Sequence, residues 1–218
     1  MTAKRIFDVS FALVLLLPGL PMLAVLWCAI AWKDGRPALY TSERMKAPGQ
    51  PFRLYKFRTM RKGSKEAESG VSGGDKAERI TPLGRKLRRL RLDELPQLFN
   101  VLKGDMSFVG PRPPMREYVE MFPEIYGEVL KSKPGITGLA TIIYHSHEEM
   151  LLRDTDSAEQ TNAVYVARCI PRKAELDILY NARQSFCFDL YLIYLTAAKL
   201  MPLPGARVAR LRAKAERV

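Results

Sequence analysis

The sequence has few of the residues that build disulfide frameworks or cysteine zinc sites. Its three cysteines, Cys28, Cys169 and Cys187, are scattered and odd in number, and no Cys-x-x-Cys pair occurs. Structural zinc sites cluster such ligands, and small secreted domains pair even numbers of cysteines. The pattern excludes both classes of site and favours a reducing, cytoplasmic environment for the soluble part.

Histidine is scarcer still, because His145 and His147 are the only two in the chain. A His-x-His pair can bind a transition metal, but no further clear ligands accompany this pair. We therefore predict an ordinary polar loop at these positions.

Acidic residues are also scarce: 23 Asp and Glu stand against 35 Lys and Arg, a net charge of +12. This surplus of positive charge predicts a polyanionic partner. The partner could be nucleic acid, anionic lipid or a phosphorylated substrate, and the net charge does not distinguish among these three. With 47% hydrophobic and 27% charged residues over 218 positions, the chain is long and apolar enough for a folded domain plus a membrane element.

Residues 9–32 contain no charge at all. About 20 apolar residues span a bilayer as a helix, and this stretch is too long for a typical signal peptide. Pro18 and Pro21 interrupt its middle, and basic residues flank both ends, so the positive-inside rule places neither end outside. We predict a helix–break–helix over residues 1–36 that enters and leaves the membrane by one face; a single spanning helix is the alternative.

The remaining chain predicts a catalytic domain over residues 37–206 and a basic amphipathic tail over residues 207–218, suited to anionic lipid headgroups. Alternating polarity over residues 51–60 indicates a strand. Residues 61–79, rich in glycine and charge, indicate a mobile loop. Residues 173–200 are predicted to be helical and to end in an apolar stretch against the membrane.

Two adjacent carboxylates, Asp93 and Glu94, lie in the most basic stretch of the chain. Pro96 is tolerated only in a first helical turn, which places Asp93 near a helix N-cap. Nearby cations and a helix N-terminus favour an ionised carboxylate, the state that a nucleophile needs. Neighbours in a helix point about 100° apart, so one carboxylate could attack phosphorus while the other holds Mg²⁺. On the pair alone, simple helix capping is the favoured interpretation.

A longer motif changes that balance. Residues 92–113 strongly resemble the signature of the monotopic phosphoglycosyl transferases, the bacterial sugar transferase family, also described as undecaprenyl-phosphate sugar phosphotransferases. Further matches follow the family order at residues 4–8, 55–60, 133–138 and 176–190. The resemblance covers most of the chain and corresponds to the minimal catalytic core of the family.

The resemblance implies an α+β, mostly helical fold with a re-entrant N-terminal membrane helix and membrane-surface amphipathic helices. Its catalytic domain would lie on the cytoplasmic face of the bacterial inner membrane. The implied enzyme transfers a sugar 1-phosphate from a UDP-sugar to polyprenyl (undecaprenyl) phosphate and releases UMP through a covalent aspartyl-phosphosugar. This is the first step of surface glycan or glycoconjugate assembly; Mg²⁺ is the implied cofactor, and downstream glycosyltransferases and a homodimer are candidate partners.

Carried over by position, Asp93 is the nucleophile and Glu94 is its partner associated with Mg²⁺. The other implied site residues bind substrate or phosphate; they are Arg88, Arg112, Lys56, Arg58 and Thr59.

The sequence also departs from the family pattern. Leu20 stands where a serine usually precedes the proline of the break, and Ser42 replaces a usual glutamine. After Gly138 the usual Trp-Ala-Gln-Val is absent, and residues 145–170 form a variable insertion. The rival interpretation is a basic membrane-tethered binding or scaffold protein without catalysis. The chain lacks a recognisable aromatic–basic nucleic-acid motif, so we expect no nucleic-acid partner.

Overall fold

The computed structural model describes residues 3–61 and 78–200 of the chain. Most of the predicted mobile loop and all of the predicted basic tail lie outside these residues. The described part is α+β and mostly helical, as predicted. Its elements are, in chain order, α1 (Ala3–Lys33), β1 (Leu39–Ala47), β2 (Gln50–Phe57), α2 (Pro82–Arg89), the 3₁₀ turn η3 (Leu92–Glu94), α3 (Gln97–Lys103), β3 (Ser107–Val109), α4 (Arg116–Met121), α5 (Pro123–Val129), β4 (Gly135–Thr137), α6 (Leu139–Arg153), α7 (Ala158–Val164), the π-helical turn η4 (Tyr165–Cys169), α8 (Ile170–Arg183) and α9 (Phe186–Leu200).

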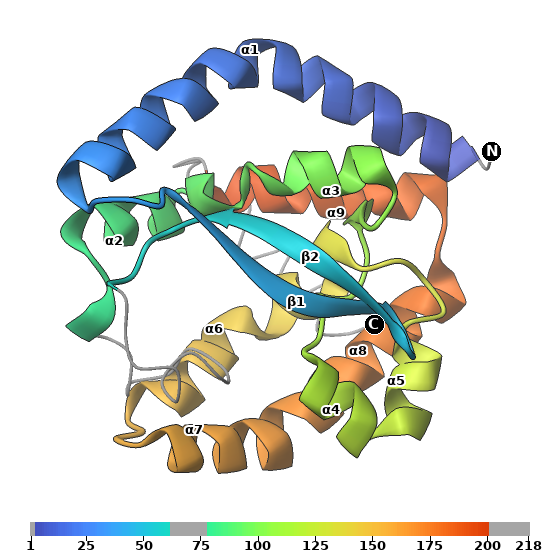
Figure 1. The fold of residues 1–218 in the computed structure, drawn as a ribbon. Helices are drawn as coiled ribbons and strands as arrows, with labels where there is room; N and C mark the ends of the chain where they lie inside the picture. The colour runs from blue at the N-terminus through green and yellow to red at the C-terminus, as the bar shows by residue number, and fades with distance from the viewer. Residues whose placement is uncertain (1–2, 62–77, 201–218) are drawn as a thin grey trace.

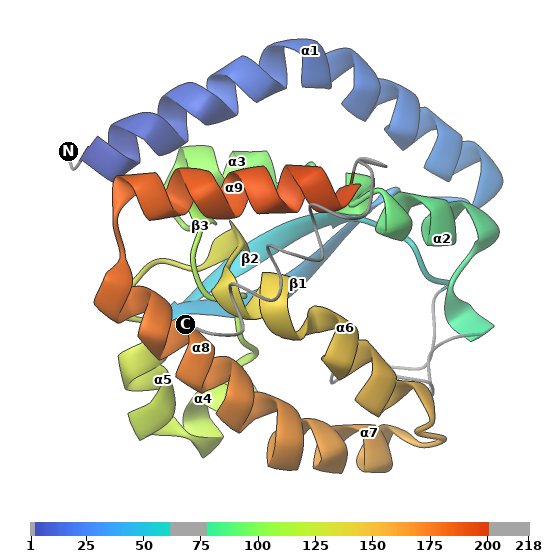
Figure 2. The same cartoon turned by 180° about the vertical axis from the view of Figure 1, so that it is seen from behind.

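The apolar helix α1 arches over the rest of the molecule, and both of its ends come down on the same body (Figures 1 and 2). Pro18 and Pro21 lie inside it, yet the helix is continuous from Ala3 to Lys33. The predicted break is therefore a bend, as expected where prolines remove backbone donors. The helix is long and apolar enough to cross a membrane, and only 17% of its most apolar window is buried against protein.

The N-terminal end of α1 is held by a polar network that reaches both β3 and α9. The Lys4 Nζ donates to the Val109 carbonyl and the Tyr180 hydroxyl, each at 3.1 Å, and forms an ion pair with Asp189. One turn later, the Asp8 carboxylate accepts from the side chain and the backbone of the first residues of β3. The apolar helix α1 is thus joined to the strand that leads into the Gly-Pro-Arg motif.

Beneath α1, the antiparallel hairpin β1–β2 crosses the middle of the molecule, below the layer of α2, α3 and α9 (Figure 1). The predicted strand over residues 51–60 is confirmed by β2. Alternate residues of the hairpin share one face, and the register places Arg44 opposite Phe52 and Tyr40 opposite Lys56. Phe52 and Leu54 pack in the main core with α1, α3 and α9.

A second, parallel pair of short strands, β3 and β4, brings the Gly-Pro-Arg and Pro-Gly-Ile-Thr-Gly segments together. A Cβ at Gly110 would lie 2.0 Å from the Lys133 carbonyl oxygen, and one at Gly138 would lie 2.1 Å from the Gly110 carbonyl oxygen. Only glycine permits this close backbone approach. It places the start of α6 beside the segment that carries Arg112.

The region after Gly138 differs from our prediction. The chain there is helical, and His145 and His147 lie on α6, so the predicted polar loop is wrong. The variable insertion over residues 145–170 forms the end of α6, then α7 and η4. Short polar stretches of this kind are ambiguous in sequence, and packing between α6 and α8 decides their helical state.

Candidate active site

The two adjacent carboxylates lie in a tight reversal of the chain between α2 and α3. Arg91 takes a left-handed conformation with φ of 58°, which ends α2 and starts η3. The N-cap of α3 is Pro96, so the predicted placement of Asp93 near an N-cap is wrong. The reversal turns both carboxylates into the protein, where Asp93 is 8% exposed and Glu94 is 4% exposed.

Glu94 is surrounded by three cations from three different segments. Its Oε1 accepts from Lys56 Nζ and Arg112 Nη2, each at 3.1 Å, and its Oε2 accepts from Arg91 Nη2 at 2.6 Å. Burial alone would raise the pKa of Glu94, but the three cations, led by Lys56, hold that pKa far below its usual value. Glu94 is therefore a fixed anion that joins β2, the α2–η3 turn and the Gly-Pro-Arg segment.

Asp93 has the opposite environment. Within the described part of the chain, no hydrogen bond or ion pair holds its carboxylate. Burial and the neighbouring charge of Glu94 raise its pKa, and Lys56, Arg91 and Arg88 only partly oppose them. Our expectation that cations would dominate at Asp93 is wrong in direction. A carboxylate with a raised pKa is the more basic one, and nucleophilic strength rises with basicity.

Arg88 and Thr59 join the site beside Asp93. The Arg88 Nε donates to Thr59 Oγ1 at 2.9 Å, and Asp93 is the charge that acts most strongly on the pKa of Arg88 after burial. Lys56 is buried enough that its pKa falls to about 8, although Glu94 opposes this shift. The structure thus brings together six of the seven predicted site residues: Lys56, Thr59, Arg88, Asp93, Glu94 and Arg112.

Arg58 is the predicted site residue that the structure places elsewhere. Its guanidinium donates to the backbone carbonyls of Asp34 and Gly35, at the turn between α1 and β1. Two-residue alternation predicted a face shared with Lys56, but β2 ends at Phe57, so the alternation no longer applies at Arg58. Arg58 instead holds the end of the apolar helix α1 against the hairpin.

The carboxylates fit Mg²⁺ unequally. Mg²⁺ usually takes one or two protein carboxylates together with substrate phosphates. Both oxygens of Glu94 already accept from cations, so Glu94 does not fit a direct metal ligand, whereas Asp93 fits one. Among the described residues no group of three or more His, Cys, Asp or Glu side chains forms a metal cluster. A metal here would therefore depend largely on substrate oxygens.

Two residues near the site were missed from the sequence. Arg91 directly precedes the motif and binds Glu94, and the basic stretch around the carboxylate pair was the available signal for it. The second is His145, which lies on α6. Burial is the main cause that lowers the pKa of His145, and the charges of Arg112 and Arg91 lower it further, whereas Glu149 opposes the shift. No spacing in the sequence relates His145 to Arg112, because only the packing of α6 places them near one another.

Comparison with known proteins decides the family. A family model described as bacterial sugar transferase matches residues 1–202. The chain belongs to the bacterial sugar transferase family. The resemblance inferred from the motifs is confirmed, and the protein is an enzyme of the transferase class.

Three relatives show what this bacterial sugar transferase is similar to. It is 36% identical over 205 residues to the uncharacterized sugar transferase EpsL of Bacillus subtilis, covering 94% of this chain and 90% of that protein. It is 41% identical over 150 residues to the undecaprenyl-phosphate galactose phosphotransferase of Salmonella typhimurium, covering 62% and 31%. It is 36% identical over 203 residues to the UDP-glucose:undecaprenyl-phosphate glucose-1-phosphate transferase of Klebsiella pneumoniae, covering 91% and 40%. The chain thus spans less than half the length of the last two of these three relatives.

Proposed function

We propose that this transferase moves a sugar 1-phosphate from a UDP-sugar to undecaprenyl phosphate and releases UMP, with Asp93 as covalent nucleophile. The names of relatives support the donor and the acceptor. The observation that carries the assignment is that the two neighbouring carboxylates have different surroundings. Glu94 is bound by three cations, whereas Asp93 is buried beside Arg88 with no partner of its own in the described residues.

The reaction then has two displacement steps. In the first, a carboxylate oxygen of Asp93 attacks the phosphorus that bears the sugar, and the bond to the bridging oxygen breaks so that UMP leaves with the electron pair. In the second, an oxygen of the lipid phosphate attacks the same phosphorus and returns Asp93 to its carboxylate. Neither leaving group needs a proton, which agrees with a site rich in cations rather than general acids.

The cations around the carboxylates would bind the phosphates and stabilise the charge that develops in each step. Arg88 acts on Asp93 and has no carboxylate partner among the ion pairs of the described residues, so it suits the transferred phosphate, whereas Arg112 and Lys56 both bind Glu94. Arginine binds phosphate through a planar set of donors, and such charge-assisted bonds are among the strongest in proteins. Glu94 would act by holding Lys56, Arg91 and Arg112 in place.

Mg²⁺ remains part of the proposal as a substrate-bound cofactor. Asp93 is the carboxylate that would help to hold it, and the ion would neutralise negative charge on the donor. Glu94 was first assigned as a metal ligand. Because its oxygens already bind cations, we instead assign it the role of holding those cations in place.

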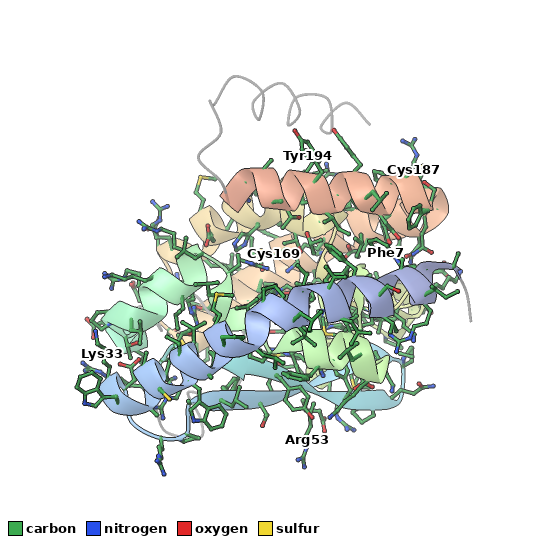
Figure 3. All side chains as sticks on the ribbon, turned by 90° about the horizontal axis from the view of Figure 1, so that it is seen from above. Phe7, Lys33, Arg53, Cys169, Cys187 and Tyr194 are labelled. Carbon is green, nitrogen blue, oxygen red and sulfur yellow. The ribbon has the colours of Figure 1, made fainter. Side chains whose placement is uncertain are left out.

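We also propose that α1 is re-entrant and that the body lies on the cytoplasmic face of the inner membrane. Both ends of the bent helix are attached to the same body, through Lys4 at one end and the cluster around Ile30 at the other. A straight span would require one end to leave that body. On α9, the exposed Phe186, Leu190 and Tyr194 recur every four residues and form an apolar face suited to the membrane surface, and Figure 3 shows Tyr194 pointing outward from this helix.

The covalent step is tested with the donor alone. The purified full chain is incubated with a panel of UDP-sugars and no lipid. With the UDP-sugar that it accepts, it should release UMP, and the peptide that contains Asp93 should gain the mass of one sugar phosphate. Asp93→Asn should lose the adduct and turnover, whereas the matched control Asp105→Asn, whose carboxylate binds Lys46 outside the site, should retain both. Turnover by Asp93→Asn near the wild-type rate, or the mass on another peptide, would contradict this mechanism. A protein that binds membranes but turns over no donor would support the scaffold alternative.

A further inference from the structure

Arg44 on β1 is a partly buried cation with no partner of its own. Its Nε atom is buried and unpaired, and no hydrogen bond or ion pair involves its side chain within residues 3–61 and 78–200. The carboxylate next to it in sequence, Glu43, points to the other face of the strand, where it accepts from Arg116 Nε at 2.7 Å. An uncompensated buried guanidinium destabilises a folded protein, so an anion that pairs with it would stabilise the fold.

The surroundings of Arg44 connect it to the active site. Its backbone lies opposite Phe52, so its side chain shares a hairpin face with Lys56, which binds Glu94. Burial, and then the nearby charge of Arg112, lower the pKa of Arg44. The other groups that act on it are tyrosine hydroxyls, the strongest of which is Tyr165; no carboxylate is among them. Arg112 is already paired with Glu94, whereas Arg44 has no anion, so a further anion that reached both guanidinium groups would offset their repulsion.

We infer that Arg44 binds, together with Arg112, the phosphate of the donor that leaves with the nucleotide. The inference deepens the proposed function and rests on it for the identity of the donor. Arg88 is influenced most strongly by the charge of Asp93 and suits the phosphate under attack. Arg112 binds Glu94, and the hydrogen bond from the Met45 N–H to the Pro114 carbonyl at 3.0 Å places the strand that carries Arg44 beside the segment that carries Arg112. The donor diphosphate has two phosphate groups. Arg88 would bind the phosphate under attack, and Arg44 with Arg112 would bind the phosphate that leaves with the nucleotide.

The charge of the site agrees with this assignment. Five cations surround the carboxylates or adjoin them, namely Lys56, Arg88, Arg91, Arg112 and Arg44. Against them stand Asp93 and Glu94, which leaves a surplus of positive charge even after both carboxylates ionise. A nucleotide diphosphate donor brings one negative charge per phosphate and would offset most of that surplus.

The test compares Arg44→Gln with Arg53→Gln in the purified full chain. Both lose one arginine from the same hairpin, but Arg53 is exposed and points away from the body (Figure 3). The probes are UDP and inorganic pyrophosphate, followed by calorimetric binding and by the rise in melting temperature. Arg44→Gln should weaken UDP binding roughly 10- to 100-fold, the size of one charge-assisted contact, while Arg53→Gln should bind as the wild type does.

Stability without ligand separates binding from a structural role. Removing an unpaired buried cation should leave the melting temperature of Arg44→Gln unchanged or raise it, and Arg44→Lys should bind UDP with intermediate strength. Wild-type UDP affinity in Arg44→Gln, or a lowered melting temperature with affinity retained, would overturn the inference. If pyrophosphate binding depends on Arg44 while no UDP-sugar is turned over, the anion site stands and the proposed function fails instead.

Discussion

Asp93 and Glu94 are neighbours in sequence, yet removing their charges should change stability in opposite directions. Glu94→Gln takes one anion from among three cations whose side chains are 20%, 24% and 39% exposed. Breaking a buried pair in this way costs about 3–5 kcal/mol, and partial solvation of the cations reduces this to about 2–4 kcal/mol. For a chain of this size, that loss lowers the melting temperature by roughly 5–15 °C.

Asp93→Asn should raise the melting temperature at neutral pH. The pKa of Asp93 is raised by burial and by Glu94, so the folded protein holds this proton more tightly than the unfolded chain does. The stability associated with that proton is present below the unfolded pKa and is lost as pH rises through the folded pKa. At pH 7, above the unfolded pKa of an aspartate, the surroundings of Asp93 therefore destabilise the fold, and a neutral amide of the same size removes that cost.

The pH dependence completes the test. The pKa of Glu94 is lowered, so its contribution is present above the unfolded pKa and is lost as pH falls toward the folded pKa. Thermal unfolding of both variants, followed by intrinsic fluorescence in one detergent, should show the largest separation near pH 7 and a smaller one near pH 4. Glu120→Gln, an exposed carboxylate on α4, serves as the control and should match the wild type. A Glu94→Gln protein as stable as Asp93→Asn at pH 7 would refute the assignment of the three cations to Glu94.

Three further predictions concern the cofactor, the membrane helix and its attachment. Turnover should disappear in EDTA and return with Mg²⁺, and full activity in the chelator would remove the metal from the proposal. Single cysteines introduced near Lys4 and near Arg36, in a background without the native cysteines, should be labelled from the same side of inverted membrane vesicles; labelling from opposite sides would establish a spanning helix. Lys4→Met and Asp189→Asn should each lower stability by about 1–3 kcal/mol, and the double variant should cost less than the sum because both remove one ion pair. Additive losses would show that the pair contributes no coupling.

Much of the site could be predicted because it is local in the chain. Asp93 and Glu94 are adjacent within a basic stretch, and the Gly-Pro-Arg segment that carries Arg112 belongs to the same motif. The length and composition of residues 9–32 were sufficient to predict the apolar helix, and alternation was sufficient to predict β2. These features depend on neighbours in sequence, whose relative placement the backbone geometry limits.

The tertiary structure alone decided how the two carboxylates differ. Lys56 reaches Glu94 across 38 positions and Arg112 across 18, so spacing could not show which carboxylate they bind. The direction of the Asp93 pKa follows from burial, which sequence spacing does not report, and it reversed our expectation. Likewise, Arg58 lies elsewhere because β2 ends one residue before it. Arg44 lies beside the Gly-Pro-Arg segment because the next residue of β1, Met45, donates its N–H to the Pro114 carbonyl. Motifs made of neighbouring residues can be recognised in the sequence, whereas desolvation and the pairing of charges that are distant in the sequence arise only when the chain packs.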